Sequence, residues 1–276
     1  MMNITTLNVM NLPFTIMIDD PTDAHVYLGA VEDIHRILVE GDRLFSPFRS
    51  DSLVSRLHRG DASVWCNEEF SEVYMRALLA RRETDGLFDP YFRGIYDPTG
   101  LTKGWIVEHA FREVLRPLLS SGEIADAAIN AGGDVIVSAR DGARDGASGW
   151  TIGIENPFDT NAYTAAMKLD GGAMATSGTS KRGEHVMRQH TDIVQASVIA
   201  DSLVDADVWA TALLAARLSD VAGLIKSYSL TAFLVTGNSR QLFYSRGSPA
   251  ATCSRPRRSE RSDPSGIPPT MKENVK

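Results

Sequence analysis

Residues 126–178 constrain the fold most, because their apolar, β-prone runs are separated by glycine turns rather than by helices. The runs read "DAAINAGGDVIV", "GWTIGIENP" and "AAMKLDGGAMATSG". Glycine permits the tight turns that join neighbouring antiparallel strands, whereas parallel strands need a long crossover. Segments with a helical period stand in separate blocks elsewhere in the chain. We therefore predict an α+β fold with a mostly antiparallel sheet and flanking helices.

The remaining elements follow from hydrophobic spacing and end signals. The chain begins with a predicted strand, "PFTIMI", followed by a helix at about 21–45 and a short helical turn in "SDSLVSRLHRG". A second helix is expected to end at Gly86, and a turn-rich loop then runs to a third helix, "WIVEHAFREVLRPLLSSG". Beyond the glycine-rich strands we expect a strand in "QASVIADS", helices at 205–217 and in "LSDVAGLIKSYS", and a terminal hairpin from "LTAFLVTG" and "QLFYS".

The composition changes near residue 248. Residues 248–276 hold five of the chain's twelve prolines and few core-forming residues. Such a segment cannot bury enough apolar surface to fold, so we predict a disordered, basic tail. It could be an interaction tail, although a dispensable extension is the simpler interpretation. Residues 1–247 are then expected to form the functional domain.

Charge and composition exclude several classes of protein. The formal net charge is -7, which argues against a nucleic-acid partner. The first twenty residues have neither a basic start nor an unbroken apolar run, and no segment is long enough to span a membrane. The two cysteines, Cys66 and Cys253, form neither a disulfide framework nor a CxxC metal pair. We expect a cytoplasmic protein.

An apolar helix in "DADVWATALLAA" carries an acid, Asp207, and a hydroxyl, Thr211, four residues apart. This spacing places both on one helix face. The acids could serve only to offset the helix dipole, with Thr211 tolerated at its position. Alternatively, both side chains direct oxygen toward one ligand.

Three other segments contain groups that suit an anion or a metal. "DPTGLTKGW" has an acid, glycines and Lys103 before a helix, although it could be a plain loop with a solvated lysine. "NAGGDV" and "GGAMATSGTSKRGEHV" are glycine turns that could equally be ordinary surface turns. The combination of Asp97, the Gly100 carbonyl, Asp207 and Thr211 offers only hard oxygen ligands, which favours Mg²⁺. Lys103 and the glycine turns could then hold a diphosphate.

In order and separation, these motifs resemble those of the FAD:protein FMN transferase family, also called ApbE. The matching stretches are "TDGLFDP", "DPTGLTKGW", "INAGGDV", "MATSGTSKRGEHV" and "ADVWATAL", with "VMNLPFTIMI" and "LFSPFRSDSLVSRL" nearer the start. The resemblance covers roughly residues 5–245. It implies a flavin-transferase (T-fold-like) α+β fold, Mg²⁺ and FAD as substrate.

The implied reaction cleaves the FAD diphosphate, transfers FMN through a phosphoester to a threonine or serine of a target flavoprotein, and releases AMP. Three alternatives stay open: an Mg²⁺-dependent FAD pyrophosphatase that yields FMN and AMP, a flavin-binding protein with impaired catalysis, and an unrelated protein with chance motifs. Family targets carry a short Ser/Thr flavinylation motif.

The resemblance also implies roles for individual residues. Gly100, Asp207 and Thr211 match metal-binding positions, and His185 with Asp207 would be catalytic. The positions that match FAD contacts are Met10, Phe48, Leu87, Phe88, Asp89, Asp97, Lys103 and Met187. The segment "HVMRQHTD" departs from the family pattern, since Arg188, Gln189 and Asp192 replace its acid, proline and glycine.

Overall fold

The computed structural model describes residues 1–19, 21–138, 149–178 and 192–250. Its helices, including one 3₁₀ and one π segment, are α1 Ala24–Phe45, α2 Leu53–His58, η1 Ala62–Cys66, α3 Glu68–Glu83, α4 Thr99–Ala110, η2 Phe111–Leu115, α5 Arg116–Ser121, α6 Leu203–Ala215 and α7 Leu218–Ser227. Its strands are β1 Met2–Val9, β2 Leu12–Asp19, β3 Asp126–Ala131, β4 Asp134–Val137, β5 Trp150–Asn156, β6 Asp159–Leu169, β7 Gly172–Gly178, β8 Ile193–Ala200, β9 Thr231–Thr236, β10 Gln241–Ser245 and β11 Ser248–Ala250.

One sheet of nine strands organises the described residues, in the order β1-β2-β3-β4-β7-β8-β9-β10-β11. Every pair of neighbours is antiparallel. The order follows the sequence, with helices α1–α5 inserted between β2 and β3 and helices α6–α7 between β8 and β9. The predicted α+β class and the antiparallel sheet are confirmed.

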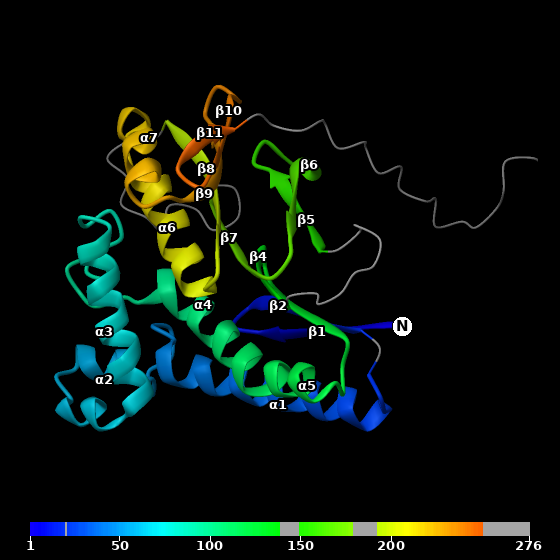
Figure 1. The fold of residues 1–276 in the computed structure, drawn as a ribbon. Helices are drawn as coiled ribbons and strands as arrows, with labels where there is room; N and C mark the ends of the chain where they lie inside the picture. Colours follow the sequence, from blue (N-terminus) through cyan, green and yellow to red (C-terminus); the bar gives the residue numbers. More distant parts are fainter. Residues whose placement is uncertain (20, 139–148, 179–191, 251–276) are drawn as a thin grey trace, which may run out of the picture.

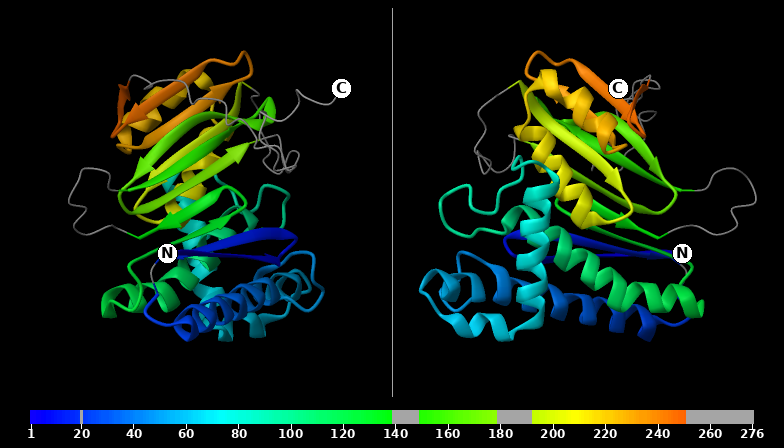
Figure 2. Two further views of the ribbon diagram at one scale, coloured as in Figure 1. Left: turned by 90° about the vertical axis from the view of Figure 1, so that its right-hand side faces the viewer. Right: turned by 60° about the vertical axis from the view of Figure 1, so that its left-hand side comes forward.

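Two different layers cover the sheet. The helices pack on one face, and a two-stranded sheet of β5 and β6 covers part of the other (Figure 1 and Figure 2). Alternate residues of a central strand enter different cores: Ile136 joins the helix-side core, whereas Val135 and Val137 join the core beneath β5–β6. A strand buried on both faces reads as a continuous apolar run, which explains "DVIV".

Most predicted elements are present, and several differ from expectation. The helix expected to end at Gly86 already ends at Glu83, where the Thr84 hydroxyl donates to the Ala80 carbonyl. The segment "AAMKLDGGAMATSG" lies in two strands, β6 and β7, which belong to different sheets. Strand β1 was not predicted; it pairs with β2 through the two-residue turn Met10–Asn11.

The largest correction concerns the loop before the third helix. The sequence predicted a loop up to residue 104, but α4 begins at Thr99 and continues through η2 and α5 to Ser121. Just before this helix, the Asp97 carboxylate accepts hydrogen bonds from the backbone N–H and the hydroxyl of Thr99, the first residue of α4. Gly100 and Lys103 therefore lie on the first turns of a helix rather than in a loop.

The chain end also differs from expectation. Residues 248–250, which we assigned to the tail, form strand β11 at the edge of the sheet. The rest of the predicted tail lies outside the described residues. Within the described ranges, no helix combines the length and the apolar character needed to cross a membrane.

Candidate active site

Helix α6 carries the predicted acid and hydroxyl one turn apart, with Thr211 against the sheet and Asp207 against α4. Asp207 is 5% exposed and Thr211 is half-buried. The Thr211 and Ser177 hydroxyls are 3.2 Å apart, which links α6 to strand β7. Because residues four apart share a helix face, the Asp207 side chain lies one turn below this contact.

Gly104 brings α4 into close contact with α6. A Cβ atom at this position would lie 3.1 Å from the Leu203 carbonyl oxygen and 3.4 Å from Cβ of Asp207. A methyl group would crowd the backbone of α6, and this accounts for a glycine inside a helix, where it otherwise costs about 1 kcal/mol relative to alanine. Gly100 lies one turn earlier on α4, so its carbonyl points along the helix toward the Gly104 contact.

Lys103 is held by an acid from the sheet. Its ammonium group forms an ion pair with Asp134, which is only 1% exposed and follows the glycine turn between β3 and β4. The other Asp134 oxygen accepts a hydrogen bond of 3.0 Å from the backbone N–H of Thr176 on β7. The buried carboxylate thus has both a cationic partner and an amide donor, as a buried charge requires.

These contacts connect β7 to α4 and α6. From β7, Thr176 binds Asp134, and Asp134 pairs with Lys103 on α4. Next to Lys103, Gly104 packs on Asp207 of α6, and Thr211, one turn along α6, contacts Ser177 of β7. We call this group of residues, drawn from two helices and two strands, the α4–α6 junction: Gly100, Lys103, Gly104, Asp134, Thr176, Ser177, Asp207 and Thr211. The structure therefore brings together four of the residues predicted from the sequence, Gly100, Lys103, Asp207 and Thr211.

The predicted residues Leu87, Phe88, Asp89 and Asp97 lie in the segment before α4. Phe88 is buried, and its ring edge would be 3.0 Å from a Cβ at Gly100, so this segment packs against the start of α4. Asp89 accepts a 3.0 Å hydrogen bond from the Tyr91 N–H and pairs with Arg81, while Leu87 is half-buried at the edge of the core.

A cluster of tyrosines supports this segment. The Tyr74 and Tyr91 hydroxyls are 2.8 Å apart, and the ring of the buried Tyr96 packs against both. Burial, followed by the hydrogen bond from Tyr74, raises the pKa of Tyr91 to about 12. Burial also raises the pKa of Tyr96. These phenols therefore stay neutral at physiological pH and act as packing groups.

Two residues that were predicted to contact the flavin, Met10 and Phe48, make no described contact with the junction residues. Met10 adopts the left-handed conformation, with φ of 53°, in the turn between β1 and β2. Phe48 follows α1 and is 88% exposed. His185 and Met187 lie outside the described residues, and their roles stay predictions.

Asp134 and Ser177 are junction residues that sequence reasoning missed. Both lie in segments that were singled out for their glycines, but not as ligand or ion-pair groups. An acid directly after a glycine pair and before the apolar run "VIV" was the available signal for Asp134, because a charged residue at the start of a buried strand needs a partner.

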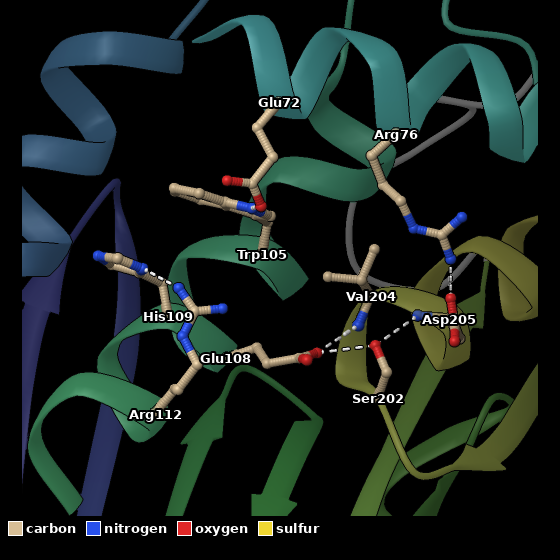
Figure 3. Close-up of a pocket in the computed structure, with 9 residues that line it drawn as sticks. All are labelled: Glu72, Arg76, Trp105, Glu108, His109, Arg112, Ser202, Val204 and Asp205. Atoms are coloured by element: carbon tan, nitrogen blue, oxygen red, sulfur yellow. Dashed lines mark hydrogen bonds and ion pairs between the residues drawn. The ribbon is translucent and has the colours of Figure 1, made fainter. Parts of the chain in front are cut away.

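A separate hollow of about 170 Å³ lies between α3, α4 and the start of α6 (Figure 3). Its lining residues are Glu72, Arg76, Trp105, Glu108, His109, Arg112, Ser202, Val204 and Asp205. None of the predicted site residues lines it. Within the described ranges, no group of three or more His, Cys, Asp or Glu side chains could hold a metal.

Comparisons with known proteins agree with this architecture. A flavin transferase ApbE from Vibrio cholerae is 18% identical, with a TM-score of 0.70 over 90% of this chain and 98% of that chain. An ApbE protein from Thermotoga maritima is 18% identical, with a TM-score of 0.69 over 87% and 96%. The flavinyl transferase ApbE from Pseudomonas stutzeri, in its apo form, is 16% identical, with a TM-score of 0.70 over 90% and 96%.

At these identities the similarity establishes a shared fold, which confirms the fold that the resemblance implied. No curated protein matches the chain. The ApbE family model matches residues 95–234, about half of the chain, and this range includes α4, the β3–β4 turn, β7 and α6. The chain therefore belongs to the ApbE family.

Proposed function

We propose that this protein is an Mg²⁺-dependent FAD:protein FMN transferase. Membership of the ApbE family supports this, as do the names of two structural neighbours, a flavin transferase and a flavinyl transferase. The observation that carries the proposal is the junction, where a carboxylate and a hydroxyl of α6 converge with a lysine of α4.

In the proposed reaction, a threonine or serine hydroxyl of a target flavoprotein attacks the phosphorus on the FMN side of the diphosphate. The bond from that phosphorus to the bridging oxygen breaks, AMP leaves with the oxygen, and the hydroxyl loses its proton. His185 is our candidate for accepting this proton. The products are the FMN phosphoester of the acceptor and AMP.

The donor set of the junction fits a hard divalent cation. Asp207 offers a carboxylate, Thr211 a hydroxyl and Gly100 a backbone carbonyl, and Mg²⁺ typically takes one or two carboxylates plus the phosphates of its substrate. When bound, the cation would neutralise charge on the diphosphate. A single acid suffices for such a site, so the absence of a three-acid cluster among the described residues is compatible with it.

Lys103 adds a fixed positive charge at the start of α4. Its ion pair with Asp134 and the packing of α4 on α6 hold the ammonium in place before substrate binds. The N-terminus of α4 contributes the positive end of its helix dipole, which favours phosphate oxygens. The loop containing Phe88 packs on Gly100, where we expect it to contact the flavin nucleotide.

Incubation with FAD, Mg²⁺ and an acceptor fragment that carries a Ser/Thr flavinylation motif tests the proposal. We expect a covalent FMN adduct on the acceptor by mass spectrometry and an equal amount of AMP by chromatography, with Asp207→Asn as the inactive control. AMP release at the same rate without acceptor would identify an FAD pyrophosphatase instead. FAD that binds and is never cleaved would identify a flavin-binding protein.

A further inference from the structure

The start of α6 is held by a carboxylate from another helix. One oxygen of Glu108, on α4, accepts hydrogen bonds from the Ser202 hydroxyl at 2.8 Å, the Leu203 N–H at 2.8 Å and the Val204 N–H at 3.1 Å (Figure 3). The Ser202 hydroxyl in turn accepts a hydrogen bond from the Asp205 N–H. A helix leaves its first N–H groups without partners inside the helix, and a negative charge there is favourable.

Glu108 and Gly104 make two contacts between the same pair of helices. They lie one turn apart on α4, and their partners Leu203 and Asp207 lie one turn apart on α6. At Gly104 the two helices touch without room for sliding, and at Glu108 a charge-assisted hydrogen bond fixes the position of α6 along that contact. Together these contacts set the position of Asp207 relative to Gly100 and Lys103.

Among the described residues, the Glu108 side chain makes its hydrogen bonds with the start of α6 rather than with residues of the junction. It lines the hollow between α3, α4 and α6, together with Ser202 and Val204, and this hollow contains no predicted site residue (Figure 3). Glu108 therefore acts on the junction through the backbones of two helices, the start of α6 and α4 itself, rather than through a described side-chain contact. A second contact from the same side, the ion pair of Arg76 with Asp205, is more exposed and so contributes less.

We propose that Glu108 is a positioning residue for the divalent-cation site, because it anchors the helix that supplies Asp207 and Thr211 to the helix that supplies Gly100 and Lys103. This inference rests on the proposed function. Side chains that orient metal ligands without touching the metal typically change metal affinity by about 10- to 100-fold when they are mutated, and Glu108 acts one step further out, on the helix that carries the ligands.

The test compares Glu108→Ala, Glu108→Gln and the control Glu72→Ala. Glu72 lines the same hollow and accepts a 3.0 Å hydrogen bond from Trp105, but it makes no hydrogen bond to α6. Binding of Mn²⁺ in the presence of ADP, which carries the same adenosine diphosphate as FAD, is measured from the electron paramagnetic resonance signal of free Mn²⁺. The melting temperature of each metal-free protein is measured in parallel.

We expect Glu108→Ala to weaken Mn²⁺ binding by about tenfold and Glu108→Gln, whose carbonyl can still accept the amide hydrogen bonds, by about threefold. Glu72→Ala should lower the melting temperature but leave Mn²⁺ affinity at the wild-type value. If Glu108→Ala does not fold, the inference is tested by comparing the Mn²⁺ affinity of Glu108→Gln with that of Glu72→Ala.

Mn²⁺ affinities of the folded Glu108 variants within about twofold of wild type would show that Glu108 only stabilises the fold and would overturn the inference. Wild-type protein that neither binds Mn²⁺ with ADP nor releases AMP from FAD would instead refute the proposed function, and the inference would fall with it. The two failures are therefore distinguishable.

Discussion

The segment before α4 and the α4–α6 junction satisfy their polar groups in different ways. In the segment, Asp97 binds Thr99 and Asp89 binds Tyr91, each two residues along the chain. In the junction, Ser177 reaches Thr211 across 34 residues, and Asp134 reaches Thr176 across 42. The carboxylates of the segment are thus satisfied by near neighbours in the chain, whereas the junction exists only once the sheet and both helices have assembled.

The largest expected effect follows from removing the junction carboxylate. Asp207→Asn should lower metal-dependent AMP release from FAD by about a hundredfold or more, because the ligand charge is lost. The matched variant in the segment is Asp97→Asn, whose amide oxygen can still accept from Thr99. It should keep its hydrogen bond to Thr99 and lose far less activity. Equal losses in the two variants would remove the distinction between the regions.

The second effect concerns stability. Lys103→Met leaves Asp134 buried without its cation, so we expect the free energy of unfolding to fall by about 3 kcal/mol, measured with urea. In the segment, Arg81→Met breaks the exposed pair with Asp89 and should cost less than about 1 kcal/mol. A Lys103→Met variant as stable as wild type would mean that the ion pair does not hold the junction together.

The third effect is a difference in Mn²⁺ affinity between alanine variants of two glycines on α4. At Gly104 an added Cβ meets the backbone oxygen of Leu203, so Gly104→Ala should displace α6 and weaken Mn²⁺ binding by about tenfold. At Gly100 the added Cβ meets the edge of the Phe88 ring. A side chain yields more readily than backbone, so Gly100→Ala should change Mn²⁺ affinity less. The reverse order would contradict the close approach of the helices.

The smallest effect is expected at Phe48, outside both regions. Because the side chain is 88% exposed, Phe48→Ser should change the free energy of unfolding by less than about 0.5 kcal/mol. If the ring contacts FAD, as the resemblance implies, the Michaelis constant for FAD should rise several-fold while kcat stays unchanged. A variant with an unaltered Michaelis constant would exclude Phe48 from the site.

Much of the fold could be predicted because local patterns determine it. The helical spacing of Ile34, Ile37 and Leu38 predicted α1, and the glycine pair predicted the turn between β3 and β4. The loop before α4 was predicted too long, since two glycines suggested irregular backbone. Gly104 is required instead by the approach of a helix 100 residues later in the chain, which no local pattern reveals.

The site could be predicted only in part for the same reason. The helical repeat placed Asp207 and Thr211 on one face, and the resemblance singled out Gly100 and Lys103. Their partners Asp134 and Ser177, and the anchor Glu108, contribute through tertiary contacts from residues distant in sequence. An isolated acid on a helix carries no signal that it binds another helix.

The double coverage of the sheet has a consequence for the order in which its backbone exchanges hydrogen with solvent. Amides of β3, β4 and β8 are hydrogen-bonded on both sides and roofed by side chains above and below, so only global unfolding should release their protons. The edge strands β1 and β11 each have a neighbour on one side alone, and deuterium should enter them earlier. Ser177 lies on β7, which pairs with the slowly exchanging strand β8. The backbone amides on the sheet side of the junction should therefore stay protected from exchange while the edge strands already exchange.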